Sequence, residues 1–429
     1  MGNKIGVLVF PAGEINSVEL HDALATCVNI ELYGASSVDR HGEYVFRNYI
    51  ADVPKINDNR FLDALNEIIV KNSIDVIIPT HDDVALFLAE HKEKIKAKTL
   101  TPDYYTALIC RDKKQTYELF REEEFCPKVW AEPIQYPVFI KPRRGQGGVG
   151  AKVIKRQADV PLEMEWSEYV VCEYLPGEEL TVDCLTDKNG KLQAIMPRSR
   201  QRVFGGVSVH AKCEVLTEEI RNIAESINQK LNFLGLWYFQ IKQDENGCYK
   251  LLEIATRCAG TMCVSRAKGV NLPLLSVYAA MGRDIAVYAN DYALEADRML
   301  ITRYKTDLEY DTVYIDLDDT ILINGKVHLP MIRFIYQCVN EGKRIVLLTR
   351  HACDHADSVQ EVLRKHRISS LLFDEIVELS FDVPKYTVIK DKNAIFIDNA
   401  YAERKQVYEN CGIAVFDVDG IEVLLDWRT

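Results

Sequence analysis

The sequence predicts a multidomain protein of mixed α/β and α+β class, with a parallel α/β domain at each end and a two-lobed α+β domain between them. Its 429 residues exceed what one hydrophobic core usually organises. Short apolar runs alternate with helical periodicity in the first and last parts, and the middle part is richer in strands. The predicted domains are residues 1–105, 106–295 and 311–429, and a polar stretch at 303–311 precedes the last of them.

The first domain has the alternation of a parallel sheet covered by helices. We expect strands at Ile5–Phe10, Val28–Tyr33 and Ile74–Pro79. A helix between the last two would start behind Asn57 or Asp58 as its cap, and its apolar face is Phe61, Leu62, Leu65, Ile68 and Ile69. The domain is therefore Rossmann-like. The glycine fingerprint of dinucleotide-binding domains is missing after the first strand, so we expect no nicotinamide or flavin cofactor.

The later domains show the same kinds of signal. In the middle domain we expect strands at 138–142, 169–175 and 250–257, and a helix whose apolar face is Ile220, Ile223, Ala224, Ile227 and Leu231. In the last domain we expect strands at 312–317, 345–348 and 394–397.

Composition narrows the classes of function. No stretch approaches the roughly 18 to 20 uninterrupted apolar residues of a membrane span, and the apolar start runs into Pro11 without a signal-peptide cleavage site. The 12 cysteines are scattered singly, which is typical of free thiols in a reducing cytosol. The formal charge of −12 disfavours nucleic acid as a partner. We therefore expect a cytoplasmic protein with small-molecule partners, bound to neither membrane nor nucleic acid; a homo-oligomer stays open.

The most informative stretch runs from Lys141 to Gly150, where a strand ending in lysine leads into a loop with four glycines in six residues. Glycines at that density let backbone amides approach phosphate oxygens. Lys141 would lie beside the phosphates, and Arg143 or Arg144 could add charge-assisted hydrogen bonds. Alone, such a loop is weak evidence, because a minority of glycine-rich strand exits are only mobile turns, and no Walker sequence follows it.

Its context makes the signal specific. The segments 112–120, 138–150, 171–185 and 249–257 follow one another in the order and approximate spacing of the ATP-grasp superfamily. Residues 1 to about 295 resemble those enzymes, most closely the large-subunit modules of carbamoyl-phosphate synthase and related carboxylate–amine ligases. The resemblance implies that the first domain is a pre-ATP-grasp domain and that the cofactors are ATP and Mg²⁺.

The resemblance also implies roles for single residues. Lys113 and Lys141 would bind the ATP phosphates under a loop that includes Gly145, Gly147 and Gly148. Glu173 and Leu175 would meet the adenine through their backbone, and Glu179 would accept from the ribose. Glu253 matches one magnesium ligand and Gln240 a second, and Arg257 matches the arginine that faces the transferred phosphate. Relatives commonly carry Glu-x-Asn-Pro-Arg where this chain has Glu253-Ile-Ala255-Thr256-Arg257, so Thr256 or a water would fill the gap, or a second metal would be held loosely.

The substrate residues are less defined. Arg198, Arg200 and Arg202 alternate, so on a strand they would share one face and could clamp an acyl phosphate or a carboxylate; a solvated basic edge strand explains them too. His81 and Asp82 follow a predicted strand of the first domain, where parallel sheets collect ligands. His210 is more often a structural histidine than a base.

A second constellation starts at Asp316, directly after an apolar run. Asp316 and Asp318 can share one Mg²⁺ and one phosphate, the first attacking phosphorus and the second moving the proton. Thr349, Lys385 and Asp398 each lie beside a further apolar run. This set is similar to the four motifs of the HAD superfamily.

That resemblance implies an aspartyl-phosphate on Asp316, general acid/base action by Asp318, phosphoryl contacts from Thr349 and Lys385, and a Mg²⁺ site made with Asp398. Only about ten residues, 321–330, separate the first strand from the next helix, so we expect a HAD-like domain with a minimal cap. The group His351, Cys353, Asp354 and His355 has the composition of a metal cluster, but a helix-start cap is the preferred interpretation.

Together these features predict an ATP-dependent, ADP-forming ligase that joins a carboxylate to an amine or similar nucleophile through an acyl phosphate. It would be fused to a Mg²⁺-dependent phosphatase for a phosphate monoester, in a small-molecule biosynthetic pathway. The alternative, which Ala255 favours, is a HAD phosphatase whose ATP-grasp part binds nucleotide as a regulator without ligase turnover.

Overall fold

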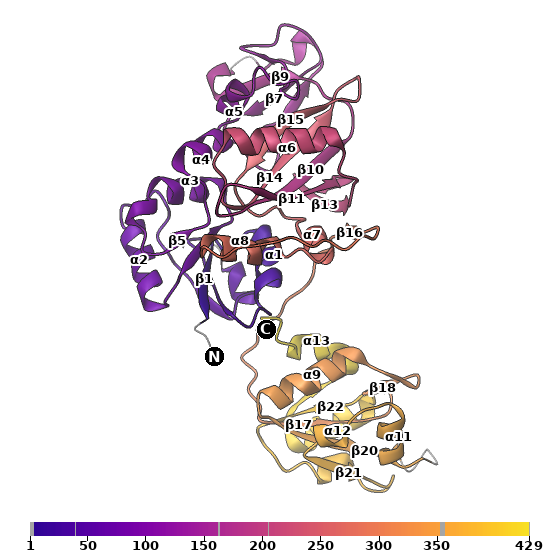
Figure 1. Ribbon diagram of the computed structural model, residues 1–429. Coiled ribbons are helices and arrows are strands. Elements are labelled where there is room, and N and C mark those ends of the chain that lie inside the picture. The colour runs from indigo at the N-terminus through magenta and orange to yellow at the C-terminus, as the bar shows by residue number, and fades with distance from the viewer. Residues whose placement is uncertain (1–3, 39, 162–163, 205, 352–356, 429) are drawn as a thin grey trace. The chain divides into compact units, whose positions relative to one another are not determined.

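The computed structural model describes residues 4–38, 40–161, 164–204, 206–351 and 357–428. The chain forms two compact units, and the second begins at Ile301 (Figure 1). This division coincides with the predicted polar stretch. It does not separate residues 1–105 from 106–295, so that boundary stays a prediction. No helix among the described residues is long and apolar enough to cross a bilayer.

The N-terminal unit begins with a five-stranded parallel sheet in the order β3-β2-β1-β4-β5. Its strands are Ile5–Phe10, Ile30–Ala35, Asn48–Ile50, Val76–Pro79 and Lys98–Thr99 for β1 to β5. Its helices are α1 (Ile15–Leu24), α2 (Phe61–Lys71) and α3 (Asp82–Glu90). The predicted strands are confirmed within two residues, and α2 buries Phe61, Leu65 and Ile69.

The predicted cap of α2 is wrong. The residue before the helix is Arg60, and Asp58 instead accepts hydrogen bonds from the backbone N–H and the guanidinium of Arg60. The aspartate therefore stabilises the turn that enters the helix, not its first turn of backbone amides.

Two antiparallel sheets follow, after the short helices α4 (Tyr104–Arg111) and α5 (Lys113–Leu119). The first has the order β6-β9-β7-β8 and consists of Val129–Trp130, Tyr169–Glu173, Val138–Pro142 and Lys152–Ile154. The second has the order β11-β10-β14-β15 and consists of Leu192–Ser199, Glu179–Thr186, Gly235–Gln243 and Tyr249–Ala255.

Helix α6 (Glu218–Lys230) covers one face of the second sheet, as Figure 1 shows. Its predicted apolar face packs against alternate residues of β10 and β14, including Val182 and Phe239. Because successive residues of a strand point to opposite faces, the intervening side chains of these strands lie on the face away from α6. That face carries the polar residues of the site described below.

The remaining elements of the unit include a small sheet and two helices, and a shared core packs the parallel sheet against the second antiparallel sheet. A small sheet in the order β12-β13-β16 consists of Arg202–Phe204, Val207–Lys212 and Glu295–Asp297. Helices α7 (Cys263–Ala267) and α8 (Leu272–Ala280) lie beside α1 in Figure 1. One core contains Val7 and Leu20 together with Leu236 and Leu272. Residues 1–105 therefore share buried apolar surface with the part of the chain that follows.

The C-terminal unit is a five-stranded parallel sheet in the order β21-β20-β17-β22-β23. These strands are Glu375–Glu378, Arg344–Thr349, Thr312–Ile315, Ala394–Ile397 and Ala414–Phe416. The helices are α9 (Leu329–Asn340), α11 (Val359–Lys365), α12 (Tyr401–Cys411) and α13 (Ile421–Leu424). The short connection from β17 to α9 holds a hairpin of β18 (Leu322–Ile323) and β19 (Lys326–Val327).

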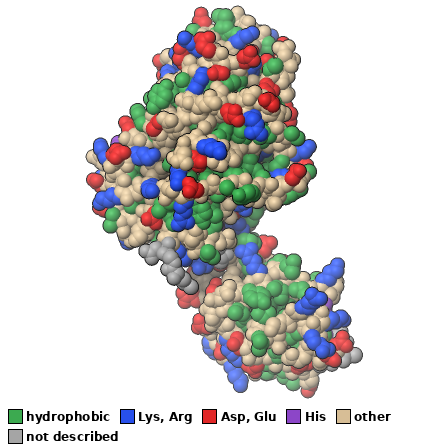
Figure 2. Space-filling model, in the orientation of Figure 1, with side chains coloured by type: hydrophobic (Ala, Val, Ile, Leu, Met, Phe, Trp, Pro, Cys, Tyr) green, Lys and Arg blue, Asp and Glu red, His purple; other side chains and the backbone are tan. Residues whose placement is uncertain are grey.

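Charged side chains of both signs are interspersed over the face of the N-terminal unit shown in Figure 2. Among the described residues of this face there is no continuous basic surface of the kind that binds nucleic acid.

Candidate functional site

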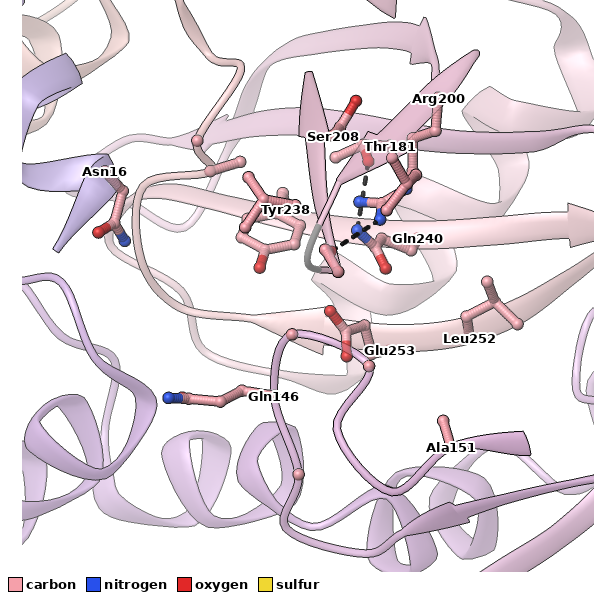
Figure 3. Close-up of a pocket in the computed structure, with 18 of the residues that line it drawn as sticks. Asn16, Gln146, Ala151, Thr181, Arg200, Ser208, Tyr238, Gln240, Leu252 and Glu253 are labelled. Atoms are coloured by element: carbon pink, nitrogen blue, oxygen red, sulfur yellow. Dashed lines mark hydrogen bonds between the residues drawn. The ribbon is translucent and has the colours of Figure 1, made fainter. Parts of the chain in front are cut away.

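A cavity of about 410 Å³ opens on the face of the second antiparallel sheet that lies away from α6 (Figure 3). The glycine-rich loop forms one wall, the strands β10, β14 and β15 form another, and residues 14–16 and 80–81 close one end. Many of the predicted site residues line it: His81, Lys113, Lys141, Gly145, Gly147, Gly148, Glu179, Arg198, Arg200, Gln240, Glu253 and Arg257.

Two lysines lie on the wall nearest the glycine-rich loop. Lys141, on β7, donates to the carbonyl oxygen of Leu252 at 2.8 Å, and its Nζ lies 5.2 Å from the centre of the Tyr117 ring. Burial lowers the pKa of Lys141. Lys113, at the start of α5, donates to the carbonyl oxygen of Gly145 at 2.9 Å, and its Nζ lies 3.4 Å from a carboxylate oxygen of Glu253.

The glycine-rich loop requires glycine for its backbone and for its contacts. Gly147, Gly148 and Gly150 have φ values of 60°, 70° and 75°, in the left-handed region that side chains with a Cβ rarely adopt. Gly206, between β12 and β13, packs so closely that a Cβ there would lie 1.6 Å from the carbonyl oxygen of Gly147. The loop therefore meets the β12–β13 hairpin across the cavity.

His81 also contacts this loop. Its Nδ1 accepts from the backbone N–H of Asp83 at the start of α3, and its Nε2 lies 2.8 Å from Nε2 of Gln146. With Nδ1 as acceptor, Nε2 carries the proton, so the facing Gln146 atom must be the amide oxygen. The histidine predicted as a substrate residue thus connects the first domain to the loop.

A polar network crosses the sheet in the middle of the cavity. Gln240 on β14 is opposite Thr181 on β10 and opposite Glu253 on β15 in the strand registers. Glu179, at the start of β10, forms an ion pair with Nε of Arg200 at 2.7 Å. The side chains of Gln240, Glu253 and Tyr238 reach the same cavity in Figure 3.

The expectation that three alternate arginines share one face is wrong. Strand β11 ends at Ser199 and β12 begins at Arg202, so the three residues do not lie on one continuous strand. Arg198 is 1% exposed and pairs with Asp183 through two hydrogen bonds of 2.9 Å. Arg202 is exposed and pairs with Asp297. The edge-strand interpretation fails for Arg198 as well, because this side chain is buried.

Arg257 lies at the end of the cavity near the first domain. It forms an ion pair with Asp82 at 2.7 Å, and its guanidinium carbon lies 5.5 Å from the centre of the Tyr238 ring. Burial of Asp82 opposes its ionisation, but Arg257 and neighbouring cations outweigh this and lower the pKa of Asp82. Asp82 is thus an ionised partner that fixes the arginine in place.

The predicted adenine contacts lie beside the cavity rather than in its lining. The backbone N–H of Glu173 donates to the carbonyl oxygen of Lys128 at 3.0 Å, and its carboxylate accepts from the N–H of Lys128 at 2.8 Å. Leu175 is buried. The backbone N–H of Glu173 is therefore already engaged within the chain.

Other side chains in the cavity have no family motif to mark them. Asn16 donates to the carbonyl oxygens of Thr80 at 2.8 Å and Cys258 at 3.1 Å, and so connects the first domain to the segment after β15. Tyr238 precedes the predicted Gln240 by two residues on the same strand face, which is the one sequence signal that could have indicated it. His210 bonds to Glu295 on β16, as expected for a structural histidine.

The C-terminal unit contains a second polar cluster, at the carboxyl ends of β17 and β22. The buried Lys385 donates to Asp316 and to Asp398, each at 2.7 Å. Burial raises the pKa of Asp316, the nearby Lys385 opposes that rise, and Asp398 adds to it. Three of the predicted residues therefore meet, in an arrangement with one cation between two carboxylates.

Asp318 lies beside His351, whereas the sequence predicted that it shares a cation with Asp316. Its carboxylate oxygens lie 2.8 and 2.9 Å from Nδ1 of His351. Among the described residues, no three acidic, histidine or cysteine side chains converge in a metal-binding arrangement. The predicted sharing of one cation by the side chains of Asp316, Asp318 and Asp398 is therefore not seen. Thr349 is buried, and its hydroxyl accepts from the N–H of His351 at 3.1 Å.

Cys353, Asp354 and His355, which the sequence suggested as a cluster, lie outside the described residues.

A family model and a curated relative each match part of this chain. Residues 165–303 match the family described as "ATP-grasp in the biosynthetic pathway with Ter operon". Carbamoyl-phosphate synthase of Methanobrevibacter smithii is 25% identical over 244 residues, which are 49% of this chain and 65% of that protein. The chain thus spans just under two thirds of the length of this relative.

Solved structures show the fold. The biotin carboxylase domain of Hydrogenobacter thermophilus 2-oxoglutarate carboxylase, in complex with MgADP, ADP and bicarbonate, matches with a TM-score of 0.54 and 17% identity over 68% of this chain and 72% of its own. L-amino acid ligase from Bacillus licheniformis matches with a TM-score of 0.52 and 15% identity over 65% of this chain and 75% of its own. At such identities the likeness concerns the ATP-grasp fold alone.

Proposed function

We propose that this ATP-grasp protein is an ADP-forming ligase that activates a carboxylate as an acyl phosphate and joins it to an amine or similar nucleophile. The observation that carries the proposal is the convergence of Lys113, Lys141, Glu179 and Glu253 on one cavity beneath the glycine-rich loop. Fixed cations, backbone amides and a hard oxygen ligand are what a magnesium-bound triphosphate requires. The likeness to carbamoyl-phosphate synthase and to L-amino acid ligase supports the same class of reaction.

In this proposal Lys113 and Lys141 bind the phosphates, and the loop at 145–150 covers them. The carbonyl of Glu173, the neighbouring Leu175 and the carboxylate of Glu179 receive the adenosine. Glu253 fits a Mg²⁺ site because its carboxylate faces the cavity within reach of the phosphate lysines, 3.4 Å from Nζ of Lys113. The ion would neutralise charge on the triphosphate when bound.

Arg257 is proposed to face the phosphoryl group during transfer. Its ion pair with Asp82 and its position over the Tyr238 ring hold the guanidinium in one orientation, so little reorganisation accompanies the reaction. The acceptor and the carboxylate would enter the end of the cavity near Asn16 and His81; Arg198 and Arg200 also line the cavity.

For the C-terminal unit we propose a HAD-type phosphatase that acts on a phosphate monoester. The support is that Asp316 and Asp398, which directly follow the parallel strands β17 and β22, both accept from Lys385. Oxygen of Asp316 would attack phosphorus while the ester oxygen leaves with a proton from Asp318, and water would then release phosphate. Asp316 and Asp398 fit a Mg²⁺ site because carboxylate oxygens are the ligands that Mg²⁺ prefers, and the two side chains lie close enough to share Nζ of Lys385.

The ligase proposal is tested with purified protein, ATP, Mg²⁺ and panels of carboxylates and amines. The expected result is ADP release that requires both a carboxylate and an amine and that is lost in Lys141→Ala. If ADP release is the same with and without each acceptor while nucleotide still binds, the result would support the regulatory alternative that Ala255 favours.

The phosphatase proposal is tested with an aryl phosphate. Hydrolysis should disappear in Asp316→Asn and persist in Lys141→Ala, because the two residues belong to separate units. Full hydrolysis by Asp316→Asn would show that another group attacks phosphorus.

A further inference from the structure

The residue predicted as the second magnesium ligand, Gln240, has an amide whose orientation can be decided from its neighbours. With its oxygen toward Arg200, that oxygen accepts from Nη1 at 2.6 Å and the amide nitrogen donates to Oε1 of Glu253 at 3.3 Å. The opposite orientation, drawn in Figure 3, gives one long contact of 3.4 Å to the hydroxyl of Thr181. It also sets an N–H group against a guanidinium, which has donors only. The first orientation is therefore the one that the site stabilises.

Arg200 is itself fixed beside this amide. Its Nε lies 2.7 Å from Glu179 and its Nη2 donates to the carbonyl oxygen of Gly206 at 3.4 Å. Its side chain is 13% exposed. The guanidinium therefore holds a permanent positive charge against the oxygen that would have to bind a cation.

A divalent cation on that oxygen would be poorly placed. Mg²⁺ lies about 2.1 Å from its ligands, so it would come within about 5 Å of Nη1 of Arg200. Like charges at that distance repel, and the neutral amide oxygen of Gln240, unlike the carboxylate of Glu253, brings no negative charge to offset the repulsion. The next position on this face of β15 is Ala255, opposite Tyr238, and its methyl group offers no ligand.

We infer that Gln240 is a positioning residue that holds Glu253 through its amide nitrogen, and that Arg200 occupies the place of a second cation. The cavity then takes one divalent cation per nucleotide, on Glu253. This rests on the proposed binding of a magnesium-bound nucleotide, and it adds the number of cations and the role of the two residues.

The test counts bound cations on the full-length protein. Equilibrium dialysis with Mn²⁺ and a non-hydrolysable ATP analogue gives the manganese and the nucleotide retained with the protein. Only the manganese that binds in addition when the nucleotide is present is counted, because the acidic site of the C-terminal unit can bind Mn²⁺ without nucleotide. We expect a ratio of one in the wild type.

Variants separate positioning from ligation. In Gln240→Met the ratio should stay at one while half-saturation requires several-fold more Mn²⁺, because Glu253 loses its fixed orientation. In Arg200→Met combined with Gln240→Glu, a second Mn²⁺ should appear. A ratio of two in the wild type that falls to one in Gln240→Met would overturn the inference and leave the proposed function standing. Failure of the wild type to retain the analogue at all would overturn both.

Discussion

The buried pair of Arg198 and Asp183 makes a strong prediction about stability. Both side chains are at most 2% exposed, and two hydrogen bonds of 2.9 Å join them. Asp183 also accepts from the hydroxyl of Ser265 at 3.2 Å. Substitution Asp183→Asn keeps the shape but leaves a guanidinium charge buried without its counter-ion. Breaking such a pair costs about 3 to 5 kcal/mol, and the near-complete burial places this pair inside that range.

The assay is native-state hydrogen exchange of the β10 and β14 peptides, because a two-unit chain does not unfold in one step. A loss of about 3 kcal/mol corresponds to a fall in protection on the order of 100-fold. The control is the double variant Asp183→Leu/Arg198→Met, which removes both charges and should stay within about 1 kcal/mol of the wild type. Less than a fivefold change in Asp183→Asn, or equal damage in the double variant, would refute the assignment of a buried ion pair.

Three other predictions follow from single contacts. Gly206→Ala should weaken binding of an ATP analogue by at least about tenfold, because the new Cβ would collide with the glycine-rich loop. The control is Gly190→Ala, at a residue with a similar φ of 79° and no atom within 4 Å of the new Cβ, which should bind the analogue like the wild type. Equal affinities in the two variants would exclude the contact. Burial raises the pKa of Asp316, so the folded state binds its proton more tightly than the unfolded state and stability falls as pH rises toward neutral. With EDTA, Asp316→Asn should therefore raise the melting temperature at pH 8 but hardly at pH 4, and an equal rise at both would contradict this. His351→Asn should lower kcat of aryl phosphate hydrolysis by roughly tenfold with KM unchanged, because the histidine orients Asp318; a change confined to KM would point to substrate binding.

Local patterns were enough to predict most of the fold. Apolar runs located β1, β7, β17 and β22 within two residues, because each is a buried strand with apolar side chains on consecutive positions. The amphipathic helix α6 was predicted from its 3.6-residue period. Where the pattern depends on neighbours along the chain, the sequence predicted the element, although the cap of α2 was predicted wrongly.

Failures arose where a partner lies far along the sequence. The alternation of Arg198, Arg200 and Arg202 predicted one strand face, but the chain leaves the sheet after Ser199. No local pattern reveals that Asp183, on the neighbouring strand, neutralises Arg198. The role of Gln240 as a ligand stays a prediction, and it likewise depends on a residue elsewhere in the chain, Arg200, which lies against its amide.

The charged residues of the cavity differ in whether they already pair with a carboxylate of the chain, and this difference indicates which of them should attract an anionic ligand. Arg198, Arg200 and Arg257 each have a carboxylate of the chain within 3 Å. A carboxylate therefore already holds each of these arginines before any anion arrives, and their main effect on an anion is to fix geometry. Lys141 differs, because among the described residues it contacts a carbonyl and an aromatic ring and no carboxylate lies within ion-pair distance. A buried ammonium without a carboxylate in direct contact is stabilised most by an incoming anion, so the affinity for phosphate should depend on Lys141 more than on any of the arginines.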